Sequence, residues 1–167
     1  AVLISDVLWV EQDLRFHFNQ IEEQLRPLLQ SRQQPDSLRQ HATFMLNNSA
    51  GVAGVQLWQQ QQLVFSSTSN LAEISGLQPS LKLAQVSGHA VFSPVIKING
   101  DNLVAVLLHQ SGSTAVAWVS LQRLIEQQVP WWFAHRYRLV LQDWQGQVLA
   151  SKSSVEAGAA QLSYQLA

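Results

Sequence analysis

The feature that most constrains the fold of this sequence is the dipeptide Asn99-Gly100, which stands between two apolar segments. Both residue types tolerate positive φ, so the dipeptide predicts a tight β-hairpin turn, here Asn99-Gly100-Asp101. A second turn is expected at residues 111–114, where the sequence reads Ser-Gly-Ser-Thr. The sequence therefore predicts three consecutive antiparallel strands, at Ala90–Ile98, Leu103–Gln110 and Ala115–Leu121.

Two helices are predicted before these strands. Apolar side chains recur at three- and four-residue steps over Val7–Leu29, which indicates an amphipathic helix that Pro27 should kink or stop near its end. A second helix is expected over Ser37–Asn48, with Asp36 as its N-cap and Gly51 as its C-terminal stop signal.

Shorter elements are predicted on both sides of the three strands. A hairpin is expected around Gln60-Gln61, and the Ser-rich segment from Ser66 to Ser80 is expected to form an insertion over the sheet, with a helix-like patch at residues 71–74. The remaining predicted elements are strands at Val52–Gln59 and Leu63–Ser67, a helix over Leu121–Arg136 interrupted at Pro130, a hairpin of Tyr137–Gln142 and Gln147–Ala150, and the start of a strand at Leu162–Ala167. This order predicts an α+β fold, with an antiparallel sheet of about five strands and the N-terminal helices on one face.

Composition excludes several classes of function. The net charge is −1 and charged residues make up 13%, so no bulk field attracts nucleic acid or anionic lipid. The chain has no cysteine, and it contains no nucleophile-elbow, zinc-protease or phosphate-loop motif. The sequence therefore predicts no catalytic site, no metal site and no cofactor. The longest apolar run, Leu103–Leu108, is too short to span a bilayer, and we expect the chain, which begins at Ala1, to come from a longer precursor.

Several strand residues have two interpretations. The aromatic residues Trp58, Phe92 and Trp118 belong either to the core or to a pocket beneath the insertion, and Lys97 is either solvated or directed at an anionic ligand. Residues that face each other across the Asn99-Gly100 hairpin sum to about 199. His89 and His109 are then near neighbours, either as ordinary sheet residues or at the rim of the pocket.

The first helix also carries apolar residues outside its main stripe. Trp9, Phe16 and Leu29 are displaced from it, so some apolar surface is expected to remain exposed. Such a helix packs either on its own domain alone or also against a second copy. A weak homodimer through Trp9 and Phe16 is the second interpretation.

With these residues placed, the chain resembles the extracytoplasmic PDC or Cache sensor domains, which are PAS-like domains of bacterial receptors. The resemblance is carried by the long first helix, the second helix ending in Asn-Asn-Ser-Ala-Gly at residues 47–51, the hairpin at 52–67, and Gly-His-Ala-Val-Phe-Ser-Pro-Val at 88–95. Residues 129–151 resemble the junction that opens a second sensor module, or the membrane-proximal part, in PAS-type sensor histidine kinases.

The resemblance implies a PAS-like sheet and a division into a helix at 1–34, a sensor domain at 35–124, and an extension or start of a second module at 125–167. It implies a non-catalytic periplasmic input domain of an inner-membrane receptor, tethered by flanking segments, with a small anionic or polar ligand. A histidine kinase is the favoured output, with a diguanylate cyclase or chemoreceptor as alternatives. Dicarboxylate-binding members use basic and hydroxyl groups over this sheet, roles open to Lys97 and Ser93, whereas the Arg-x-Trp-Tyr signature of amino-acid-binding members is absent. The candidate ligand residues are Trp58, Phe92, Ser93, Lys97, His109 and Trp118.

An envelope scaffold domain is the alternative function, because low charge and an apolar helix suit it equally well. An enzyme ranks third, because no constellation of titratable residues supports one.

Overall fold

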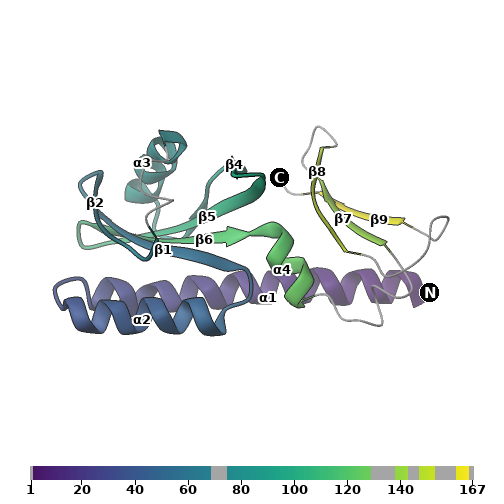
Figure 1. The fold of residues 1–167 in the computed structure, drawn as a ribbon, viewed down its shortest axis with the longest axis horizontal. Coiled ribbons are helices and arrows are strands. Elements are labelled where there is room, and N and C mark those ends of the chain that lie inside the picture. The colour runs from purple at the N-terminus through teal and green to yellow at the C-terminus, as the bar shows by residue number, and fades with distance from the viewer. Residues whose placement is uncertain (1, 69–74, 129–137, 143–146, 153–160, 166–167) are drawn as a thin grey trace.

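The computed structural model describes residues 2–68, 75–128, 138–142, 147–152 and 161–165, and its fold is α+β (Figure 1). The central sheet has six strands in the order β2-β1-β6-β5-β3, with β4 also paired to β5, and every pairing is antiparallel. The strands are β1 (Val52–Gln59), β2 (Gln62–Ser66), β3 (Val91–Phe92), β4 (Ile96–Ile98), β5 (Asp101–Gln110) and β6 (Ser113–Ser120). The predicted fold class is confirmed.

Two helices cover one face of this sheet, as the sequence predicted (Figure 1). Helix α1 (Val2–Gln30) buries Ile21, Leu25 and Leu28 against it and continues through Pro27, so the proline does not stop the helix. Helix α2 (Pro35–Asn48) begins before Asp36, which makes the prediction of Asp36 as N-cap wrong. The reason is that proline suits the first helical position, where its fixed φ is helical and no N–H needs a partner.

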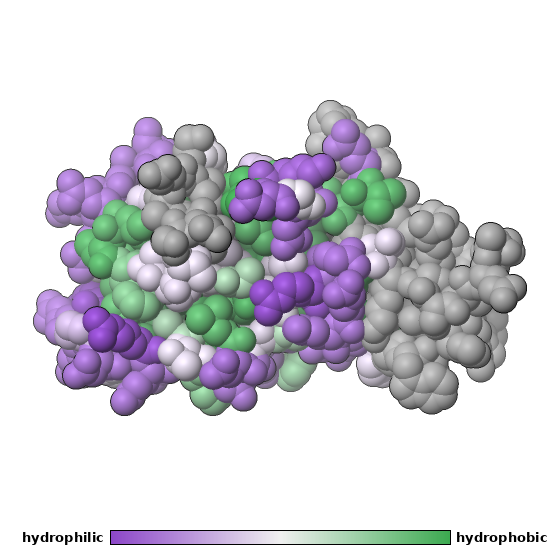
Figure 2. All heavy atoms as spheres, in the orientation of Figure 1, coloured by the Kyte–Doolittle hydropathy of each residue, from purple (hydrophilic) through white to green (hydrophobic). Residues whose placement is uncertain are grey.

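The other face carries a helix that the sequence analysis missed. Helix α3 (Gln78–Val86) follows a 3₁₀ turn, η2 (Ser75–Leu77), and buries Leu81 and Ala84 beside Trp58 and Trp118. The helix-like patch expected at residues 71–74 lies outside the described residues. Figure 2, in the orientation of Figure 1, shows patches of hydrophobic residues on the visible face, with hydrophilic residues between and around them.

The three predicted turns are two-residue hairpins with positive φ at both central residues. The φ values are 51° and 82° at Asn99 and Gly100, 56° and 84° at Ser111 and Gly112, and 49° and 67° at Gln60 and Gln61. The flanking pairs are Ile98 with Asp101, Gln110 with Ser113, and Gln59 with Gln62. The pairing of Ile98 with Asp101 confirms the register predicted across the Asn99-Gly100 hairpin.

The prediction of one continuous strand over Ala90–Ile98 is wrong, because residues 93–95 interrupt it. Ser93 N–H donates to Ala105 O at 2.9 Å, and Ala105 N–H donates to Ser93 Oγ at 2.8 Å. The hydroxyl thus accepts the bond that a strand carbonyl would ordinarily accept, and the next residue, Pro94, has no N–H to offer a ladder. Consequently the register shifts by one residue between Val91–Leu107 and Ile96–Leu103.

A second, three-stranded sheet follows helix α4 (Leu121–Gln128). Its strands are β7 (Arg138–Gln142), β8 (Val148–Lys152) and β9 (Gln161–Gln165), in the order β8-β7-β9. Strands β7 and β8 form the predicted antiparallel hairpin, and β9 is parallel to β7. The predicted continuation of the helix from residue 129 to Arg136 lies outside the described residues.

Candidate ligand-binding surfaces

The six residues predicted to bind a ligand are divided between the two faces of the central sheet. Trp58 and Trp118 are buried in the cluster under α3. Phe92 is 54% exposed and lies edge-on to Phe18 of α1, with ring centroids 5.6 Å apart, so it faces the opposite side. Lys97 is exposed and lies between Ile96 and Ile98, which pack on the α3 side; alternation along the strand therefore directs Lys97 to the α1 side.

Ser93 and His109 occupy two further positions. Ser93 is buried, and its hydroxyl, besides accepting from Ala105, donates to Pro94 O at 2.8 Å. His109 is half-buried, and its Nδ1 shares a hydrogen bond of 2.9 Å with Thr114 Oγ1. The structure thus brings Trp58 and Trp118 together but does not gather all six around one point, and their binding roles remain predictions.

The predicted neighbourhood of His89 and His109 follows from the pairing of β3 with β5. The register of Val91 with Leu107, extended by two positions, places His89 opposite His109. His89 itself precedes β3 and is exposed, with Nδ1 at 2.8 Å from Ala90 O. Among the described residues, no group of three or more potential metal-ligating side chains occurs.

Gln56 is the polar residue of the α3 face that the sequence analysis missed. Its side chain is 0% exposed, and its Oε1 accepts hydrogen bonds from the indole N–H of Trp58 at 3.1 Å and of Trp118 at 2.9 Å. Buried indole N–H groups need an acceptor, so Gln56 fixes the orientation of both rings. The available signal was a glutamine two residues before Trp58, on the same face of an otherwise apolar strand.

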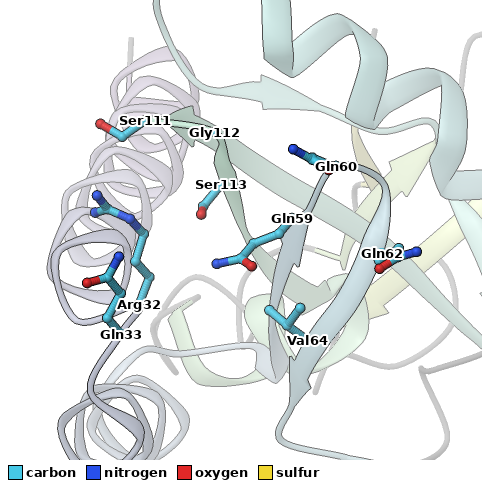
Figure 3. A pocket seen from close by; sticks show the side chains of 9 residues that line it. All are labelled: Arg32, Gln33, Gln59, Gln60, Gln62, Val64, Ser111, Gly112 and Ser113. Carbon is cyan, nitrogen blue, oxygen red and sulfur yellow. The ribbon is translucent and has the colours of Figure 1, made fainter.

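A polar pocket of about 380 Å³ lies at the tips of two hairpins, between them and the end of α1 (Figure 3). Among its described lining residues Arg32 is the charged one, and its Nη1 donates to Leu29 O at 2.8 Å. This contact caps the carbonyl end of α1, where the helix dipole is negative and favours a cation over an anion. This capping role accounts for the presence of Arg32 in the pocket without a bound ligand. The pocket is lined by Arg32, Gln33, Gln59, Gln60, Gln62, Val64, Ser111, Gly112 and Ser113.

The outward face of α1 carries the two residues predicted to meet a second copy. Trp9 is 46% exposed and Phe16 is 62% exposed, whereas Leu29 is buried in the core. Trp9 and Phe16 are seven residues apart, about two helical turns, and therefore lie on the same side of α1. None of the described helices combines the length and the apolar character that crossing a membrane requires.

Comparison with curated proteins finds a match to the C4-dicarboxylate transport sensor protein DctS of Rhodobacter capsulatus. The two sequences are 28% identical over an alignment of 159 residues, and the match covers 92% of this chain and 24% of DctS. The chain therefore spans about a quarter of the length of this relative, and the predicted resemblance to a bacterial sensor protein is confirmed as distant homology. No family model matches the chain. No solved structure matches it either.

Proposed function

We propose that this chain is the periplasmic input domain of a membrane-bound signal-transduction receptor, where it senses a ligand or a protein partner. The observation that carries the proposal is that the homology to a sensor protein extends over 92% of the chain. It therefore spans both sheets and is more than a local motif shared by unrelated proteins. The α+β architecture expected of such a domain supports the same function.

The output of this receptor is proposed to be a two-component histidine kinase in the cytoplasm. The chain itself then carries no catalysis, and flanking segments tether it to the inner membrane. Residues 1–34 are proposed to form the long helix and residues 35–124 the sensor domain, while residues 125–167 form either a C-terminal extension or the start of a second sensor module.

The proposed ligand is a small dicarboxylate, in line with the name of the relative, a C4-dicarboxylate transport sensor protein. Two exposed or half-exposed candidates, His109 on the α3 side and Lys97 on the α1 side, lie on opposite faces of the sheet. Each carries nitrogen donors that suit a carboxylate when the group is protonated. A ligand bound on one face depends on one of these residues and is insensitive to the other.

A thermal-shift titration with succinate, using butyrate as the monocarboxylate control, tests this proposal. A ligand that binds the folded state alone stabilises it by about 2.7 kcal/mol at one hundred times its dissociation constant. For a chain of this size that corresponds to a midpoint rise of about 5 °C or more. Succinate is expected to produce this rise, and butyrate is not.

Repeating the titration with His109→Ala, Lys97→Ala and Arg32→Gln locates the site. Loss of the shift in one variant alone assigns the ligand to the α3 face, the α1 face or the pocket at the hairpin tips, respectively. If succinate, fumarate and malate all leave the midpoint unchanged, the dicarboxylate ligand is wrong and the scaffold alternative gains support.

The partner proposed for α1 is a second copy of the chain. Exposed aromatic residues on one side of a helix are best hidden by self-association, and a two-fold dimer achieves this with one patch. Sedimentation is expected to show a monomer–dimer equilibrium that Phe16→Glu weakens. The exposed Phe44→Glu on α2 serves as the matched control, and an equilibrium equally sensitive to both variants contradicts an α1 interface.

A further inference from the structure

Helix α4 lies between the two sheets, and its contacts with the central sheet differ from its contacts with the second sheet. At the first end β6 passes directly into α4, with Ser120 as the last strand residue and Leu121 as the first helical one. Ser120 Oγ accepts from Arg123 N–H at 3.3 Å, donates to Asp101 Oδ1 at 3.0 Å, and thereby caps the helix and ties it to β5.

Gly51 closes this corner from the other side. Its carbonyl accepts from Ser120 N–H at 2.8 Å, and its N–H donates to Gln127 Oε1 at 2.8 Å. Its φ is +78°, and a Cβ added there would come within 2.8 Å of Leu124 Cβ. With Leu121, Leu124 and Ile125 buried, α4 is therefore held on the central sheet by close packing and hydrogen bonds together.

At the second end, the side-chain amide of Gln122 on α4 bonds to the backbone of β8. Gln122 Nε2 donates to Ser151 O at 2.7 Å, and Ser151 N–H donates to Gln122 Oε1 at 2.9 Å. Gln122 thus pairs with β8 as a neighbouring strand would. Glu126 Oε1 also accepts from Gln122 Nε2, at 2.8 Å, which holds the amide in this orientation.

Two further contacts of described residues join β8 to the central sheet and to α1. Asn102 Nδ2 donates to Leu149 O at 2.9 Å, and the Leu149 side chain is buried in the same cluster as Val10 and Leu14 of α1. Val148, the residue before it, is exposed. Gln122 and Ser151 are half-buried, whereas Ser120 and Leu121 at the corner are fully buried. Water reaches the half-buried pair more easily, so the Gln122–Ser151 contact is expected to open more readily than the corner at Ser120.

Opening would uncover a strand edge. Strand β8 is at the edge of its sheet, with β7 on its other side. Both backbone groups of Ser151 bond to Gln122, so both point away from β7, and without Gln122 they would be unpaired groups on an open edge.

We propose that the Gln122–Ser151 contact is a releasable latch, and that the second sheet docks reversibly on a rigid unit formed by α1, the central sheet and α4. Resting on the proposed sensor function, this latch is the point at which a change in the central domain alters the position of the second sheet. Movement of the second sheet then opens the contact between α4 and β8 and leaves the corner between β6 and α4 intact.

Hydrogen exchange measured by mass spectrometry on the whole chain tests the latch without any ligand. In Gln122→Ala, peptides from β8 are expected to exchange about tenfold faster, because the two hydrogen bonds to Ser151 are lost. Peptides from β5 and β6 are expected to keep their exchange rates, because these bonds do not involve them. Gln128→Ala, on the same helix and with no side-chain hydrogen bond among the described residues, is the matched control and is expected to change neither.

Gly51→Ala disrupts the corner between β6 and α4 and leaves the Gln122–Ser151 contact in place. Because it forces Leu124 away from the corner, it is expected to speed exchange in β6 and α4 together. Unchanged β8 exchange in Gln122→Ala, or an equal acceleration of β5, β6 and β8, would overturn the latch. Since these rates require no dicarboxylate, failure of the latch is distinguishable from failure of the proposed ligand.

Discussion

The two faces of the central sheet are buried by different means. On the face toward α1 and α2, aliphatic side chains such as Val55, Leu57 and Val106 meet Leu25 and Leu28 of the long helix. Packing of this kind is non-directional, and its strength follows the apolar area removed from water.

Packing on the face toward α3 depends on the geometry of hydrogen bonds as well as on the apolar area that is buried. Gln56, buried between Trp58 and Trp118, must keep its carbonyl oxygen within reach of both indole N–H groups. A missing acceptor would leave two buried donors unsatisfied. The α1 face is therefore held by the larger cluster of aliphatic side chains, whereas the α3 face also specifies one arrangement of its aromatic rings.

Leu25→Ala is expected to have the largest effect, because it opens a cavity on the α1 face. Leu25 is fully buried, and such truncations cost about 3 kcal/mol of unfolding free energy. Urea denaturation measures this, with the half-exposed Leu8→Ala on the same helix as the control. Equal losses for the two variants would mean that α1 contributes little packing to the sheet.

Gln56→Leu tests the directional face with little change in volume. We expect a loss of about 2 kcal/mol, since both indole donors lose their acceptor. Near-UV circular dichroism should change together with stability, because Trp58 and Trp118 are released from one fixed orientation. The exposed Gln62→Leu is the control. A stable variant with an unchanged aromatic spectrum would show that burial alone orders these rings.

Ser93→Ala probes the edge where the two faces meet. Ala105 N–H would lose its acceptor, for an expected cost of about 1 kcal/mol. Exchange at the Ala105 amide, followed by NMR, should accelerate more than exchange at the Val106 amide. Ser87→Ala, at a half-exposed serine directly after α3, serves as the control. A water that replaces the hydroxyl fully would leave both the rate and the stability unchanged.

Lys97→Ala is expected to have the smallest effect on stability, within about 0.5 kcal/mol, because the side chain is exposed. Lys82→Ala, exposed on α3, is the matched control on the other side of the sheet. A loss above 1 kcal/mol for Lys97→Ala would show a structural role on the α1 face.

Much of the fold was predictable from local patterns. The hairpins at Asn99-Gly100 and Gln60-Gln61, the long first helix and the late hairpin all follow from turn chemistry and periodicity over a few residues. The errors arose where a local signal competes with a neighbour. Pro35 displaced Asp36 from the cap, and Ser93 with Pro94 broke a strand that reads as continuous.

The candidate site was less predictable, because a ligand surface depends on which side chains share a face. One shift of register in the interval from Phe92 to Ile96 is enough to alter which side chains face the same way, and the shift depends on a serine hydroxyl accepting the bond of a carbonyl. Aromatic residues on strands, such as Phe92 and Trp118, are equally compatible with core and pocket in a sequence. The structure placed Trp118 in the core and Phe92 at the surface beside Phe18.

The sequence alone determined the positions of the turns, since positive φ at Asn99 and Gly100 is a property of those residues and their immediate neighbours. Only the tertiary structure decided that Gln56 accepts hydrogen bonds from the indole N–H groups of both Trp58 and Trp118. The second of these contacts joins residues 62 positions apart and exists because β1 pairs with β6. Strand order of this kind follows from how the whole chain buries its apolar surface, so no short segment encodes it.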